Sequence, residues 1–192
     1  MVRSVTDMLD SPAPRSGTAA GTQGLVLLAC SAAFSAATAS LLITRNRQWA
    51  GASAAAAAIG LLAASVQWGR HGGRRIRFAY LVLDLGFDTA VLAPIAWIAR
   101  LPSTRVAVLA LIGLGTSYVA SYQRARGRSL GYAGSETFLY RAIRAMLLVV
   151  GLLTGWLEAA LWAFVVVTAL AAALRAWSIV QQDRSLSGGP AA

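Results

Sequence analysis

The sequence predicts an all-α membrane protein whose six transmembrane helices form a bundle. Hydrophobic residues make up 57% of the 192 residues and charged residues only 12%, whereas about 25% of the residues in an ordinary soluble domain are charged. Six apolar segments follow one another along the chain, and each approaches the ~20 residues that cross ~30 Å of hydrocarbon. The segments cover approximately 25–43, 49–68, 78–99, 104–123, 138–156 and 158–179.

The predicted membrane domain covers 25–180, and the two ends of the chain are polar. Residues 1–24 are rich in Pro and Gly, so we expect either a short interfacial helix or disorder there. Ala37-Thr38-Ala39 matches the A-x-A pattern of signal-peptide cleavage, but the long polar leader and the long apolar run favour a retained first helix. Residues 181–192 end in Ser-Leu-Ser-Gly-Gly-Pro-Ala-Ala and are predicted to be a disordered tail.

The positive charges indicate how the predicted helices are oriented. All 17 basic residues are Arg, and the formal net charge is +10. They lie between apolar segments and form no basic domain, which argues against nucleic acid as a partner. Thirteen belong to the two ends of the chain and to the second and fourth connections with the adjoining helix ends; four, Arg45, Arg47, Arg100 and Arg105, lie on the other side. The positive-inside rule therefore predicts a multi-pass protein of the plasma (inner) membrane with both termini in the cytoplasm.

Two carboxylates interrupt the third apolar segment. Asp84 and Asp88 are four residues apart, so on a helix they project from the same face, one turn apart. A charge at the centre of a membrane costs on the order of 3 kcal/mol or more, and it is usually kept only where it faces a bundle interior or a cavity. The predicted orientation places both aspartates in the cytoplasmic half of the helix.

Hydroxyl and guanidinium groups are expected near these carboxylates. Ser117, Ser121 and Arg124 fall at i, i+4 and i+7 on the fourth segment, and Arg141 and Arg144 at i and i+3 on the fifth. Carboxylates that hold a divalent cation, beside Arg and Ser groups that hold a phosphate, are the components of a site for phosphoryl-group chemistry.

A purely structural interpretation of the same residues stays open. Asp84 would then form an ion pair with Arg77 or Arg124, and the arginines near the helix ends would be topological anchors.

Three sequence patterns carry a resemblance to a known family. Residues 121–126, S-Y-Q-R-A-R, are similar to the pattern S-Y-x-K-A-R, and residues 138–144, F-L-Y-R-A-I-R, to F-x-E-R-P-E-R. Asp84 and Asp88 match the last two aspartates of D-x2-D-G-x2-A-R-x8-G-x3-D-x3-D. The chain thus resembles, over about 67–148, the CDP-alcohol phosphatidyltransferase family, and most closely the actinobacterial phosphatidylinositol-phosphate synthases.

The resemblance implies a six-helix fold, a homodimer and a reaction in phospholipid biosynthesis. A phosphatidyl group would pass from CDP-diacylglycerol to an alcohol, which in such synthases is phosphorylated, and CMP would be released. Asp88 would be the general base, and Asp84 and Asp88 would hold Mg²⁺ or Mn²⁺. The phosphate of the acceptor would be held by Ser121, Arg124, Arg126, Arg141 and Arg144.

The sequence departs from the family pattern in the first half of the signature. The first two aspartates fall at Ala63 and Val66, and no Asp or Glu occurs between Asp10 and Asp84. Two carboxylates on one helix make an incomplete metal site, because a hard cation needs six or more oxygen ligands.

Three functions therefore stay open. The first is the phosphatidyltransferase, and the second is a catalytically inactive pseudoenzyme that binds a lipid headgroup or phosphate, or that pairs with an active paralogue. The third is an unrelated small transporter or structural membrane protein.

Overall fold

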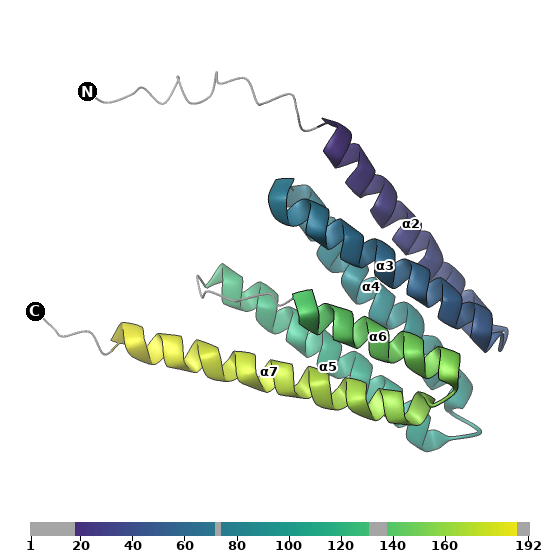
Figure 1. Ribbon diagram of the computed structural model, residues 1–192. Coiled ribbons are helices and arrows are strands. Elements are labelled where there is room, and N and C mark those ends of the chain that lie inside the picture. Colours follow the sequence, from purple (N-terminus) through teal and green to yellow (C-terminus); the bar gives the residue numbers. More distant parts are fainter. Residues whose placement is uncertain (1–17, 72–73, 131–137, 188–192) are drawn as a thin grey trace, which may run out of the picture.

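The computed structural model describes residues 18–71, 74–130 and 138–187, and these residues form six α-helices (Figure 1). The helices are α2 (Thr18–Ile43), α3 (Arg47–His71), α4 (Arg74–Ala99), α5 (Thr104–Ser129), α6 (Phe138–Thr154) and α7 (Leu157–Ser187).

The predicted all-α class and the multi-pass membrane character are confirmed. Five of the helices contain a stretch long and apolar enough to cross a membrane: Gln23–Ile43, Arg47–Val66, Phe78–Ala99, Thr104–Gly127 and Leu157–Gln182. The remaining helix, α6, has 17 residues. It coincides with the fifth predicted span, whose membrane crossing stays a prediction.

Most helices extend beyond the apolar segments that predicted them. Helix α2 begins at Thr18, within the polar segment 1–24, where alanines favour a helix. In place of the disorder expected from residue 181 onward, α7 continues through Gln181 and Gln182 to Ser187. Gln and Arg are good helix formers, and neither Gly nor Pro follows until Gly188. The rest of both segments, 1–17 and 188–192, lies outside the described residues.

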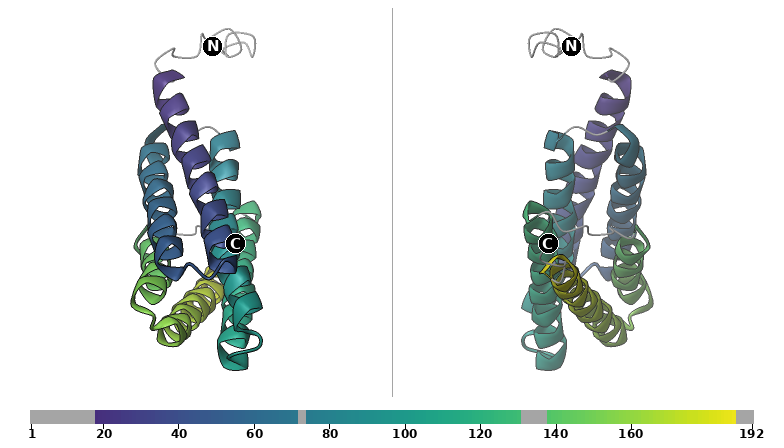
Figure 2. Two further views of the ribbon diagram at one scale, coloured as in Figure 1. Left: turned by 90° about the vertical axis from the view of Figure 1, so that its right-hand side faces the viewer. Right: turned by 90° about the vertical axis from the view of Figure 1, so that its left-hand side faces the viewer.

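The six helices form a closed ring. Going around it, each helix packs against the next in the order α2, α3, α6, α7, α5 and α4, and α4 packs against α2 again. Figure 2 shows the bundle from two opposite sides, each at right angles to the view of Figure 1. The connections α2–α3, α4–α5 and α6–α7 all lie at one end of the bundle, on the right in Figure 1. Fully buried side chains fill the interior of the ring, among them Val91, Leu92, Leu148, Leu152, Leu161 and Phe164.

Small residues allow α2 and α3 to approach closely. Ala50, Ala54 and Ala57 are fully buried, and a Cβ atom on Gly60 would collide with the hydroxyl of Ser31. Such residues are typical of helix contacts in membranes, where close backbone approach and interhelical hydrogen bonds replace the hydrophobic effect. This contact fixes one side of the ring, where Thr38 and Ser53 also form a buried hydrogen bond over 2.8 Å.

Candidate functional site

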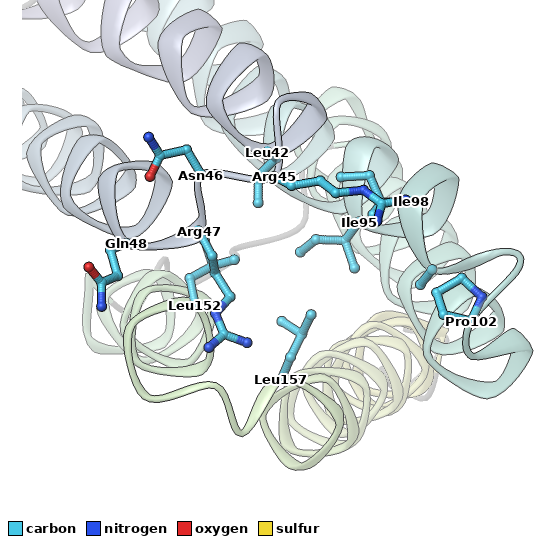
Figure 3. A pocket seen from close by; sticks show the side chains of 11 residues that line it. Leu42, Arg45, Asn46, Arg47, Gln48, Ile95, Ile98, Pro102, Leu152 and Leu157 are labelled. Carbon is cyan, nitrogen blue, oxygen red and sulfur yellow. The ribbon is translucent and has the colours of Figure 1, made fainter.

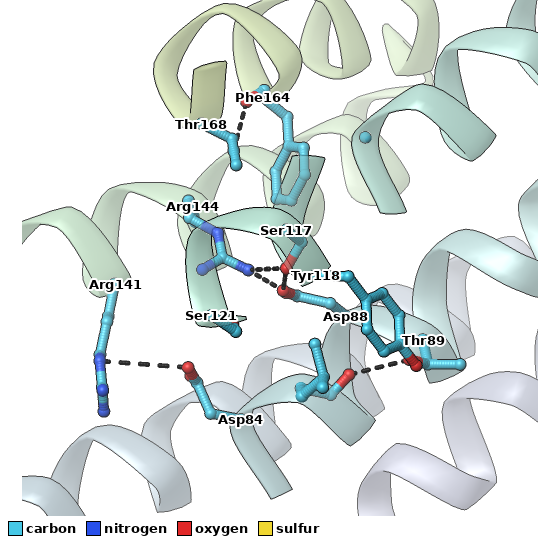
Figure 4. A network of polar contacts seen from close by, with 12 residues as sticks. Asp84, Asp88, Thr89, Ser117, Tyr118, Ser121, Arg141, Arg144, Phe164 and Thr168 are labelled. Carbon is cyan, nitrogen blue, oxygen red and sulfur yellow. Dashed lines mark hydrogen bonds and ion pairs between the residues drawn. The ribbon is translucent and has the colours of Figure 1, made fainter. Parts of the chain in front are cut away.

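The interior of the ring contains a cluster of charged side chains from three helices (Figure 4). We call this the polar cluster. Helix α4 contributes Asp84 and Asp88, α5 contributes Ser117, Ser121 and Arg124, and α6 contributes Arg141 and Arg144. The helical spacings place these residues on inward faces, so side chains from three helices meet in the interior of the ring.

The deepest part of the polar cluster is a triad of Asp88, Ser117 and Arg144. The Asp88 carboxylate accepts a hydrogen bond from the Ser117 hydroxyl and forms an ion pair with Arg144, and both contacts use Oδ2. Arg144 Nη2 also donates to Ser117 Oγ over 2.8 Å. Asp88 and Arg144 are 4% and 3% exposed, and Ser117 is fully buried. The triad neutralises Asp88, the more deeply buried of the two aspartates on α4.

Asp84 lies one turn closer to the start of α4 than Asp88 does, and its contacts are longer. Its Oδ2 lies 3.9 Å from Arg124 Nη2 and 4.0 Å from Arg141 Nε, and its side chain is 17% exposed. Arg124 Nη2 also donates to Ser121 Oγ over 2.9 Å. The ion pair between Asp84 and Arg124 is one of the structural pairs considered from the sequence, and the structure contains it.

Aromatic rings lie against the arginines of the polar cluster. The Arg141 guanidinium lies 4.8 Å from the ring centre of Tyr80, and the Arg144 guanidinium lies 5.4 Å from Tyr140 and 5.3 Å from Phe164. Cation–π contacts at such distances stabilise a desolvated guanidinium by about 1–2 kcal/mol. The rings thus help to keep two positive charges inside an apolar bundle.

A small cavity of about 20 Å³ adjoins the polar cluster. Its walls include Tyr80, Asp84, Asp88, Arg141 and Arg144. A cavity of about 10–15 Å³ accommodates one water molecule, so this space suits a single small group. A nucleotide needs a wider opening between α3, α4 and α6.

Of the predicted phosphate ligands, Ser121 lies in the polar cluster and Arg126 lies outside it. Ser121 belongs to it through its contact with Arg124. Side chains two positions apart on a helix point about 200° away from each other around its axis. Because Arg124 points inward, Arg126 points outward and is exposed. The structure therefore does not bring Arg126 to the cluster.

The donor set fits a divalent cation poorly. Among the described residues, no group of three or more His, Cys, Asp or Glu side chains lies close enough to share a metal ion. Of the two carboxylates present, Asp88 is bound by Ser117 and Arg144, and Asp84 lies between two guanidinium groups. Metal binding by Asp84 and Asp88 and the role of Asp88 as a base remain predictions.

The sequence interpretation missed the aromatic part of the site. Tyr80 is four residues before Asp84 and eight before Asp88, so the helical spacing alone identifies it as a third member of this face. Phe164 comes from α7, and no local pattern connects it with Arg144. Thr89, which bonds Tyr118 over 3.2 Å, is a second contact between α4 and α5 that the sequence did not suggest (Figure 4).

In comparisons with known proteins, no protein-family model and no curated protein sequence matches the chain.

Proposed function

We propose that the protein is a CDP-alcohol phosphatidyltransferase-like membrane protein that binds a phosphate-bearing headgroup at the polar cluster without transferring it. The ligand would be the phosphate of a lipid headgroup or of a phosphorylated alcohol. One observation carries this proposal: three buried guanidinium groups surround only two carboxylates, and every one of these five groups lies inside the ring.

The charge balance of the polar cluster supports an anion as the ligand. Arg124, Arg141 and Arg144 exceed Asp84 and Asp88 by one positive charge. A buried charge without a counterion is costly. A phosphate beside Arg124 and Arg141 would supply the missing negative charge, whereas a divalent cation would increase the excess.

Unused hydrogen-bond donors also support a phosphate ligand. Arg124 is 8% exposed, and its Nε atom has no acceptor among the described residues. Arginine favours phosphate because its planar donors can bind two oxygens at once. Arg124 lies beside Asp84, the more exposed of the two carboxylates. An incoming phosphate would therefore meet Arg124 first.

The proposed membrane arrangement has six transmembrane helices with both termini in the cytoplasm. The arginine distribution supports this orientation, because four arginines lie near the three short connections and thirteen belong to the opposite side in the sequence pattern. The ends of α3 and α5 and the start of α4 then face the cytoplasm, with the polar cluster in the adjoining half of the bundle.

The phosphatidyltransferase reaction is the second candidate function. It is favoured by the inward placement of Asp84, Asp88, Arg124, Arg141 and Arg144, the residues that the family resemblance assigns to the reaction. The reaction requires further metal ligands, and these would have to come from a second chain in the proposed homodimer. With them, Asp88 would have to leave Arg144 before it accepted a proton from the alcohol.

Binding measurements on purified protein in detergent separate the two functions. We would titrate CDP-diacylglycerol and an inositol phosphate by calorimetry, with and without Mn²⁺. For a phosphate site, Arg124→Gln and Arg141→Gln should each weaken binding about tenfold or more, the usual loss for a charge-assisted hydrogen bond. Arg126→Gln is the matched control, because it removes the same charge from an exposed position on the same helix.

Replacing an aspartate should have opposite effects under the two candidate functions. A phosphate site should retain or strengthen binding in Asp84→Asn, because this change removes a competing carboxylate. An enzyme should lose both Mn²⁺ binding and CMP release in the same variant. Equal binding by the wild type, Arg124→Gln and Arg141→Gln would refute a phosphate site at the polar cluster.

A further inference from the structure

A second pocket lies at the end of the bundle that holds the three short connections. It encloses about 570 Å³ between the α2–α3 connection, the end of α4, and the neighbouring ends of α6 and α7 (Figure 3). Apolar side chains line much of it, among them Ile95, Ile98, Leu152 and Leu157, and Arg45 and Arg47 also line it. Pockets of roughly 300–1,000 Å³ are typical of small-molecule sites.

The arginines at this end of the bundle differ in whether they have partners. Arg100 stacks on Trp97, with its guanidinium 3.3 Å from the ring centre. Arg105 forms an ion pair with Glu158 over 3.3 Å. Within the described part of the chain, the side chains of Arg45 and Arg47 have neither a hydrogen bond nor an ion pair. The two arginines without partners are the two that line the pocket.

The local backbone holds both arginines over the pocket. Arg45 has a φ of +59°, in the tight turn between α2 and α3. Arg47 begins α3, and Figure 3 shows its side chain extending between Leu152 and Leu157. Its guanidinium passes over Gly155, where a Cβ atom would lie 3.0 Å from Nη2. Gly155 therefore leaves the space that Arg47 occupies.

The chemistry of the pocket defines its ligand. No Asp or Glu among the described residues lines it, and two arginines share it with apolar side chains. An anion with an attached hydrocarbon part matches both features, because the arginines bind the charge and the wall accepts the chain. The pocket also lies at the ends of membrane-spanning helices, where phospholipid headgroups are found.

We propose that this pocket binds one anionic phospholipid through Arg45 and Arg47. The headgroup phosphate contacts the two guanidinium groups, and the first part of an acyl chain lies along Ile98, Leu152 and Leu157. The site is separate from the polar cluster, so the proposal does not depend on the function proposed above. Its occupant is a lipid of the bilayer that helps to hold the ends of α2, α4, α6 and α7 together.

Native mass spectrometry of the delipidated protein in detergent tests the proposal. The probes are dioctanoyl phosphatidylglycerol, which is anionic, and dioctanoyl phosphatidylcholine, which has no net charge. We expect the wild type to prefer phosphatidylglycerol and Arg45→Gln/Arg47→Gln to lose roughly tenfold to thirtyfold in affinity for it, since each arginine near a lipid headgroup contributes about fivefold. Arg100→Gln/Arg105→Gln removes the same charge from the same end and should change affinity by less than about threefold.

Two further variants keep the test independent of folding and of the polar cluster. Ile98→Trp fills the apolar wall, retains both arginines and should also weaken phosphatidylglycerol binding. Arg141→Gln alters only the polar cluster and should leave this binding unchanged.

Three results would overturn the proposal. The first is an unchanged lipid preference in Arg45→Gln/Arg47→Gln, and the second is an equal loss in the Arg100→Gln/Arg105→Gln control. The third is full competition by glycerol 3-phosphate, because a soluble anion without chains would then be the ligand.

Discussion

The ion pair between Asp88 and Arg144 should show one of the largest interaction energies in the protein. Both side chains are almost completely buried, with 5% and 3% of their surface exposed. Unit charges about 4 Å apart attract each other by about 4 kcal/mol at an effective dielectric constant of about 20. Removing one partner of a buried pair typically costs about 3–5 kcal/mol, while replacing both with apolar residues is often neutral. We therefore expect Asp88→Leu and Arg144→Met each to cost about 3–5 kcal/mol and the double variant to cost much less.

A double-mutant cycle measures this coupling. Reversible unfolding by SDS in mixed micelles would give the free energy of unfolding of the wild type, the two single variants and the double variant. Arg105 and Glu158 provide the control cycle, because their ion pair spans 3.3 Å but their side chains are 76% and 44% exposed. Exposed pairs contribute about 0–1 kcal/mol. A coupling below about 1 kcal/mol for Asp88 and Arg144 would refute the assignment of a tightly bound, desolvated pair.

Three further predictions concern the α2–α3 contact, the turn before α7 and the effect of salt on the two ion pairs. Gly60→Ala should destabilise the protein by about 1–3 kcal/mol, because the added methyl group meets Ser31 at the α2–α3 contact. Its control is Gly115→Ala, whose added Cβ atom would have no neighbouring atom within 4 Å. This variant should stabilise the protein by about 0.5–1 kcal/mol in the same unfolding assay. Gly155→Ala should lower the melting temperature, because Gly155 has a φ of +85° and contacts Arg47; an unchanged melting temperature would contradict the described turn. Raising the salt concentration to 1 M should abolish the coupling between Arg105 and Glu158 and largely preserve that between Asp88 and Arg144, as the two cycles would report.

The fold class could be predicted because lipid imposes strong constraints on composition and length. Long apolar runs separated by arginines have few structural solutions other than membrane-spanning helices. The helix ends were less predictable. Hydropathy marks the part of a helix that lies in lipid, whereas α5 and α7 continue into polar residues that favour a helix just as well.

The polar cluster was predictable only in part. Helical spacing placed Asp84 with Asp88 and Arg141 with Arg144, because neighbours on one helix share a face. Which aspartate meets which arginine depends on the order of helices around the ring, and local sequence does not encode that order. The contacts of Asp88 with Ser117 and Arg144, and of Arg144 with Phe164, could therefore come only from the structure.

The triad of Asp88, Ser117 and Arg144 has a consequence for the synthesis of the protein. Asp88 and Ser117 are 29 residues apart, and Arg144 follows 27 residues after Ser117. A ribosome therefore completes α4 well before it makes the arginine that neutralises Asp88, and a carboxylate alone at membrane depth costs about 3 kcal/mol. We expect α4 to enter the bilayer stably only after α6 has emerged, so that chains truncated before Phe138 leave α4 poorly inserted in a glycosylation-mapping assay. Full insertion of α4 in such truncated chains would show that its apolar residues suffice and that the arginine is needed only for assembly.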